Sequence, residues 1–133
     1  MAVTSVEGLL RGYSEDVQRL GEAARRAIRT WVPGMSESVD AAARTIAYAH
    51  APGYAGMVCT LIMSKTGIKL GIVEGASLPD PRGLLEGTGK RHRHVPLSTP
   101  GDLRRPGTKE LVLAASAACR ARLARATRSS RRR

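Results

Sequence analysis

The chain has 133 residues, of which 42% are hydrophobic, and its formal net charge is +11. This length favours a single domain with a core of its own, and the composition fits a globular protein. No apolar run approaches the roughly 18 residues that a membrane span needs, and the first residues lack the pattern of a secretory signal. We therefore expect a cytoplasmic protein that does not enter a membrane.

The first third of the chain indicates an extension followed by helix. Residues 1–13 are assigned to an N-terminal extension. Ser14 can cap a helix whose apolar stripe runs from Val17 to Trp31. A Pro-Gly pair then ends this helix, and the pattern of residues 36–44 predicts a short second helix.

A change of period after residue 44 indicates β-strands. Residues 44–51 alternate large and small side chains, and residues 57–64 form an apolar run of strand length. Residues 68–75 alternate again after a tight turn, so these two runs predict a β-hairpin. A further strand is expected at residues 91–97, and apolar spacing after residue 108 indicates a final helix. The predicted fold is α+β, an antiparallel sheet of about four to five strands with helices packed on it.

The domain is expected to span residues 14–126, and residues 127–133 are expected to form a disordered, arginine-rich tail. From Arg120 onward the chain holds seven arginines and no acid, whereas the residues before Arg120 have a net charge of only +4. Such a tail could hold nucleic acid or another anionic surface through its charge, or it could be a solvated terminus. The candidate anion or nucleic-acid contacts are Arg104, Arg105, Arg128, Arg131, Arg132 and Arg133.

The usual catalytic and metal-binding motifs do not fit. The glycine-rich stretch "GLLEGTGKRHRH" lacks the first glycine and the hydroxyl residue of a Walker A loop, and it precedes a strand where that motif precedes a helix. His92 and His94 are too few for a zinc site on their own. Cys59 and Cys119 lie in apolar runs, which favours buried reduced thiols over a disulfide. We predict no catalytic residue, no metal site and no cofactor.

Two binding regions remain. Tyr48, His50 and Tyr54 flank the break "HAPGY", and a small ligand could sit between this break and the glycine-rich loop; equally, these side chains could complete the core. The second region is a basic surface, which could contact an anion or could protect an exposed edge strand from pairing. Its residues are Lys90, Arg91, Arg93, Arg104 and Arg105, and His92 and His94 between them are further candidate ligand contacts.

The stretch "DPRGLLEGTGKRHRHVPL", together with "ARTIAYAHAPGYAG", the predicted hairpin and the closing helix, resembles the YdhG-like family, a bacterial domain of unknown function (DUF1801). The resemblance covers residues 15–124 and implies a compact α+β fold. Some members are described as frataxin-like iron chaperones. Iron binding of that type uses an exposed acidic ridge, whereas Glu15, Asp16 and Glu22 are interrupted here by arginines.

These observations favour a non-enzymatic YdhG-like binding module for a small anion or a protein partner. A frataxin-like iron-binding chaperone is the first alternative. Nonspecific nucleic-acid binding through the basic strand and the arginine tail is the second. An enzyme remains a third class, and both a monomer and a homodimer are compatible with the sequence.

Overall fold

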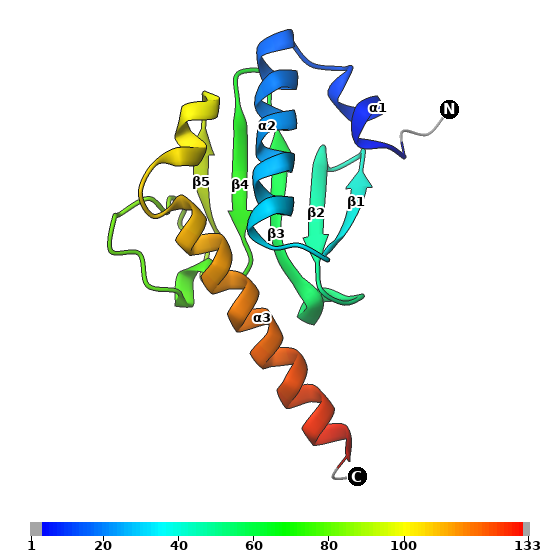
Figure 1. Cartoon of the computed structure of the whole chain (residues 1–133), viewed down its shortest axis with the longest axis vertical. Coiled ribbons are helices and arrows are strands. Elements are labelled where there is room, and N and C mark those ends of the chain that lie inside the picture. Colours follow the sequence, from blue (N-terminus) through cyan, green and yellow to red (C-terminus); the bar gives the residue numbers. More distant parts are fainter. Residues whose placement is uncertain (1–3, 132–133) are drawn as a thin grey trace.

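A five-stranded antiparallel sheet forms the centre of the molecule, and its strands follow one another in chain order (Figure 1). The structure is a computed structural model that describes residues 4–131. The strands are β1 (Ser36–Asp40), β2 (Thr45–Ala49), β3 (Met57–Met63), β4 (Ile68–Ile72) and β5 (Arg93–Leu97). Short connections join the first four strands, as is usual for antiparallel neighbours, and a long loop leads from β4 to β5.

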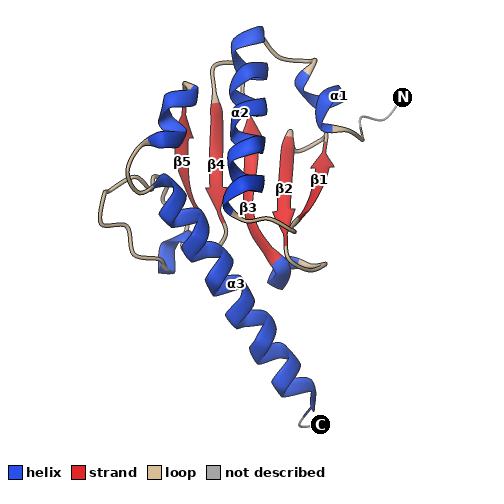
Figure 2. Cartoon of the chain, viewed as in Figure 1, coloured by secondary structure: helices blue, strands red, loops and turns tan. Residues whose placement is uncertain are grey.

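Three α-helices pack on this sheet, which confirms the predicted α+β class. They are α1 (Val6–Leu10), α2 (Glu15–Trp31) and α3 (Thr108–Arg131). Figure 2 shows α2 and α3 crossing the same face of the sheet, with α1 beside α2 at the β1 edge. Ser14 caps α2 as predicted, since its hydroxyl accepts a hydrogen bond from the backbone N–H of Val17 at 3.2 Å.

The hydrophobic core lies between the sheet and these helices. Side chains alternate along each strand, so Ile46, Leu61, Leu70 and Val95 all face α2 and α3 and are fully buried. Both cysteines belong to this core as free thiols, as the sequence predicted, and burial raises the pKa of Cys59 to about 12. Within residues 4–131, no helix is both long and apolar enough to cross a membrane.

The opposite side of the sheet, here called the open face, carries small and polar side chains. Ala47, Thr60, Gly71 and His94 lie side by side across four strands on this face. They are half-buried, and their neighbour Ile62 is 37% exposed. The open face is therefore much less covered than the face under α2 and α3.

One predicted helix is wrong. Residues 36–40 form the edge strand β1, which pairs with β2, and its residues alternate between exposed and half-buried. The turn that joins the two strands uses Arg44 in a left-handed conformation, with φ of 54°, and the Asp40 carboxylate accepts a hydrogen bond from Ala43 N–H. The four-residue spacing of Met35 and Val39 suits a helix, but here the backbone N–H and C=O groups form their hydrogen bonds with β2.

Both ends of the chain also differ from expectation. The segment assigned to an N-terminal extension contains α1, and three of its residues are buried in the core: Val6, Leu9 and Leu10. At the other end, α3 continues to Arg131, where the sequence analysis expected disorder from residue 127. Residues 132 and 133 lie outside the part that the structure describes.

Candidate functional site

Tyr48 belongs to the core, the second of the two roles that the sequence left open for it. Its ring is fully buried under the helices, and its hydroxyl donates a hydrogen bond to Glu37 at 2.8 Å. Arg25 of α2 donates to both oxygens of the same carboxylate, at 2.9 and 3.1 Å from Nε. Burial by itself would raise the pKa of Glu37, but the hydrogen bonds from Arg25 and Tyr48 outweigh it and lower the pKa below its usual value. Tyr48 therefore helps to hold β1 and β2 to α2.

His50 also lies on the helix side. Its Nε2 is 2.7 Å from the hydroxyl oxygen of Ser116, a buried residue of α3. Burial lowers the pKa of His50 below its usual value, and the positive charge of Arg120 lowers it further. This contact joins the end of β2 to α3, so His50 also completes the core and does not meet the glycine-rich loop.

Tyr54, by contrast, does contact that loop. The residue lies in a single 3-10 turn after β2, and its side chain is 44% exposed. The His92 ring lies edge-on to the Tyr54 ring, with centroids 5.8 Å apart. Arg91 lies 6.0 Å from the Tyr54 centroid, within reach of a cation–π contact.

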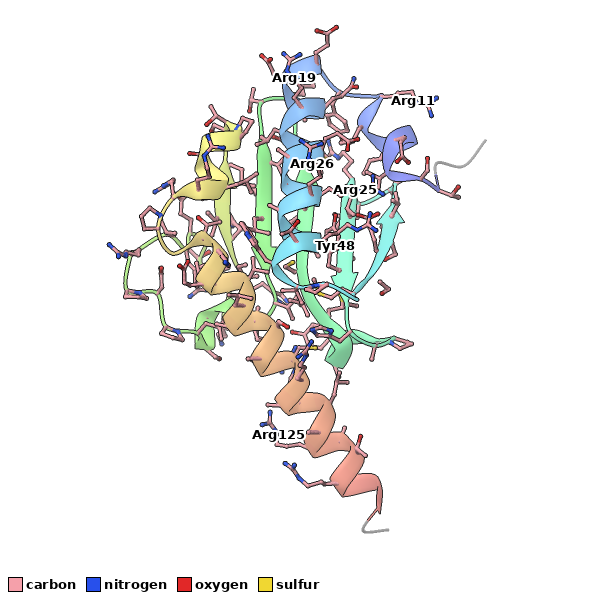
Figure 3. All side chains as sticks on the ribbon, viewed as in Figure 1. Arg11, Arg19, Arg25, Arg26, Tyr48 and Arg125 are labelled. Carbon is pink, nitrogen blue, oxygen red and sulfur yellow. The ribbon has the colours of Figure 1, made fainter. Side chains whose placement is uncertain are left out.

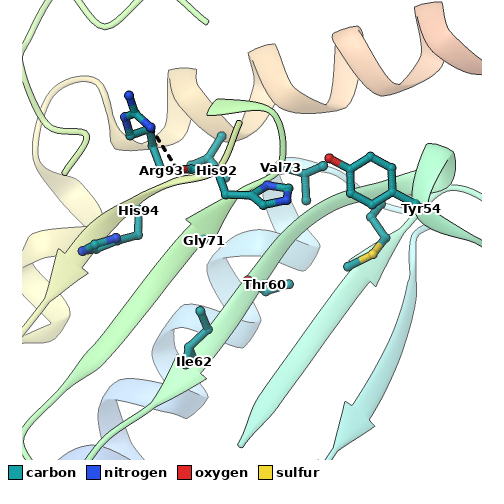
Figure 4. Close-up of a pocket in the computed structure, with 10 residues that line it drawn as sticks. Tyr54, Thr60, Ile62, Gly71, Val73, His92, Arg93 and His94 are labelled. Atoms are coloured by element: carbon teal, nitrogen blue, oxygen red, sulfur yellow. Dashed lines mark hydrogen bonds between the residues drawn. The ribbon is translucent and has the colours of Figure 1, made fainter. Parts of the chain in front are cut away.

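Tyr54 and His92 border a cavity of about 420 Å³ on the open face, here called the open-face pocket (Figure 4). Met57, Ile62 and Val73 give it an apolar lining, and Tyr54 stands at one end. Residues 92–94 form the opposite wall. In Figure 4 the His92 ring projects towards Tyr54, whereas Arg93 turns away and donates to the backbone carbonyl of His92 at 3.2 Å.

The middle of the pocket is kept open by a glycine. Gly71 lies between Thr60 on β3 and His94 on β5. A Cβ at position 71 would come 2.3 Å from the Thr60 hydroxyl oxygen, so any larger residue would have to displace that side chain. The sequence showed this glycine inside a strand, where glycine often marks a close approach of another group.

The glycine-rich loop is held in place by hydrogen bonds to its backbone. Asp80 accepts hydrogen bonds from the N–H groups of Leu84 and Leu85, both at 2.9 Å. Glu86 then exchanges two backbone hydrogen bonds with His94 and so covers the outer edge of β5. The loop thus places His92 beside Tyr54 and protects the edge of the sheet. The role of Asp80 was missed, although Asp often orders turns in this way.

Glu74 is a further site residue that the sequence analysis missed. It follows β4 in a left-handed conformation, with φ of 57°, which is unusual for a residue other than glycine. Its carboxylate accepts a hydrogen bond from the Tyr54 hydroxyl and lies 3.5 Å from Arg91 Nε. The hydrogen bond from Tyr54 and the nearby positive charges lower the pKa of Glu74. Glu74 therefore fixes the position of Tyr54 at the pocket.

The predicted basic residues do not form one surface. Lys90 and Arg91 are exposed in the loop before β5, whereas Arg104 and Arg105 follow β5 at the other end of the sheet (Figure 1). Arg128 is exposed on the projecting end of α3. The backbone of Arg131 continues this helix, and Arg132 and Arg133 lie outside the described residues.

Among residues 4–131, no three His, Cys, Asp or Glu side chains come close enough together to hold a metal ion. The frataxin-like alternative therefore gains no candidate site from this part of the chain. Comparison with protein families, with curated proteins and with solved structures finds no match for this chain.

Proposed function

We propose that this chain is a non-enzymatic, YdhG-like binding module that holds a small organic anion in the open-face pocket. The ligand would have an apolar body, which Met57, Ile62 and Val73 would cover, and a charged group beside His92. The observation that carries the proposal is an apolar cavity bounded on one side by "HRH" at residues 92–94, a run of potential hydrogen-bond donors and positive charge without an acid. The family assignment rests on the motif "LLEGTGKRHRH".

The charges around the pocket support an anion over a cation. Glu74 is the acid closest to Tyr54, and its carboxylate is already engaged by the Tyr54 hydroxyl and by Arg91. Arg93 forms part of the wall, and its charge adds to the positive potential there. An anionic group would therefore find donors at residues 92–94, whereas a cation would be repelled by them.

A hydrolase reading draws less support. His50 and Ser116 form a close pair, as a base and a nucleophile would, but Ser116 is buried. Neither residue lines the open-face pocket. A nucleophile must reach its substrate, so this pair favours a structural role over a catalytic one.

The test uses 8-anilinonaphthalene-1-sulfonate, a fluorescent anion with an apolar body, displaced by octanoate or by 1-octanol. The two competitors share an eight-carbon chain and differ in charge. We expect octanoate to displace the dye at lower concentration than 1-octanol. A His92→Gln/His94→Gln variant should weaken displacement by octanoate more than displacement by 1-octanol, because it changes only the polar wall.

Lys69→Gln is the matched control. Lys69 is exposed on the open face but does not line the pocket, and the substitution removes a full positive charge. It should leave octanoate binding unchanged. Equal displacement by octanoate and 1-octanol would contradict the proposal, and so would an equal loss of octanoate binding in the control and in the histidine variant.

A further inference from the structure

The last part of α3 projects beyond the sheet, with solvent on every side (Figure 1). Cys119 is the last residue of the helix that is buried against the core. Residues 124–129 are all exposed. About two turns of helix therefore stand clear of the domain, where another molecule can surround them.

This projecting segment carries charge of one sign. Glu110 is the last acid of the chain, and arginines recur along the helix from Arg120 to Arg131. Arg122 serves the domain itself, because it donates a hydrogen bond to the Met57 carbonyl at 3.1 Å. Arg125 and Arg128 are exposed on this segment, and Arg120 is exposed on the preceding turn, which packs on the core through Cys119. At about 100° per residue these three span roughly 140° of the helix circumference.

We propose that the end of α3 binds double-stranded DNA by lying in its major groove, with the arginines on the phosphates of both strands. A helix with its side chains is about 10–12 Å across, and the major groove is about 12 Å wide. Arginines spread over a wide arc can reach both walls of the groove, whereas a single line of arginines would reach one. The contacts go to phosphates, so the binding is independent of sequence.

Other polyanions fit this segment less well. A helix that lies on a membrane needs large apolar side chains on its inner face, and α3 has none after Leu123. Unpaired strands are held by aromatic stacking, and α3 contains no aromatic residue. The major groove of duplex RNA is too narrow and deep to admit a helix. Charge and shape together therefore favour duplex DNA.

The test is fluorescence anisotropy of a labelled 20-base-pair DNA duplex with the full chain, from about 50 to 200 mM salt, the range over which released counterions show in the affinity. Arg125→Gln/Arg128→Gln removes two exposed charges and keeps a good helix former at both positions. If both arginines contact phosphates, the slope of log K against log salt should become shallower by about 1.8.

The control is Arg11→Gln/Arg26→Gln, which removes the same charge. Arg26 is exposed on α2 and Arg11 is exposed directly after α1, and both lie far from the projecting end of α3 (Figure 3). This variant should keep the salt slope of the unmodified chain. An equal change of slope in both variants would overturn the proposal, as would absence of binding at the lowest salt.

Two further ligands test the groove placement. One is a single strand of that duplex, and the other is vesicles of phosphatidylcholine and phosphatidylserine. If the protein binds either of them more tightly than it binds the duplex, the proposal is overturned. The Arg125→Gln/Arg128→Gln variant should still bind octanoate normally, because neither residue lines the open-face pocket. Failure of DNA binding and failure of the pocket proposal are thus separate results.

Discussion

The Glu37 side chain connects the edge strand β1 to α2 and to β2. The Glu37 side chain is only 15% exposed, and its carboxylate receives hydrogen bonds from Arg25 on α2 and from Tyr48 on β2. Arg25 also reaches Glu7 of α1, with 3.2 Å between the charged atoms. The three side chains depend on one another, because removing the Glu37 carboxylate would leave Arg25 and Tyr48 largely buried without this hydrogen-bond acceptor.

Glu37→Gln should therefore lower the free energy of unfolding by roughly 1.5–3 kcal/mol, the usual range for a hydrogen bond to a charged group. Urea denaturation measures this change. Glu15→Gln is the control, since the Glu15 side chain is 89% exposed and its ion pair with Arg19 is 3.9 Å long. It should change stability by less than about 0.5 kcal/mol. Equal losses in both variants would show that the Glu37 network does not stabilise the fold.

The long connection between β4 and β5 is the element that builds the open-face pocket. Near its start is Glu74, which orients Tyr54. It ends at His92, which forms the pocket wall together with Arg93 and His94 of β5. Between them Asp80 holds the backbone of residues 84 and 85, and Glu86 pairs with His94. The geometry of the pocket therefore depends on hydrogen bonds within one loop.

Asp80→Ala should loosen this loop, because two backbone N–H groups lose their acceptor. We expect faster hydrogen exchange at Leu84 and Leu85, together with weaker octanoate binding. Asp40→Ala is matched to it, since Asp40 also accepts from a backbone N–H, in the turn between β1 and β2. Unchanged exchange in the 84–94 segment of the Asp80 variant, or an equal effect of Asp40→Ala there, would contradict this account.

Over the whole molecule, several ionisable groups couple stability to pH in the same direction. The pKa values of Glu37, Glu74 and Asp102 are lowered in the folded state, the last because Ser98 and Thr99 donate backbone hydrogen bonds to it. The pKa of His50 is lowered as well, by burial and by Arg120. In each case the unfolded chain binds protons more readily than the folded one.

Between pH 3 and pH 8, stability should accordingly be greatest above the unfolded pKa of histidine, about 6.5. It should fall in two stages on acidification, first as the pH drops below that value, through His50, and then below about 4.3, through the carboxylates. Urea midpoints between pH 8 and pH 3 measure this. His50→Asn should remove the first stage, and Glu37→Gln should reduce the second. Stability that rises on acidification would contradict the assignment of these groups.

The spacing of apolar side chains along the sequence was enough to predict most of the fold. The alternation in β2 and β4, the apolar run of β3 and the stripe of α2 each depend on local spacing, and all of them form as predicted. β1 was misread because five residues carry too little pattern to separate a strand from a helix. Of the predicted pocket residues, Tyr54 and His92 do meet, while Tyr48 and His50 lie on the other side of the sheet.

The sequence by itself determined the fold class, the buried thiols and the position of the charge at the end of the chain, because composition and period act over short distances. Only the tertiary structure decided which partners meet. Arg25 reaches Glu37 over 12 positions, and Tyr54 reaches Glu74 over 20. Such pairs follow from the register of the strands and the angle of the helices, which arise when the whole chain packs. The projecting end of α3 was decided in the same way, because the sheet ends before the helix does.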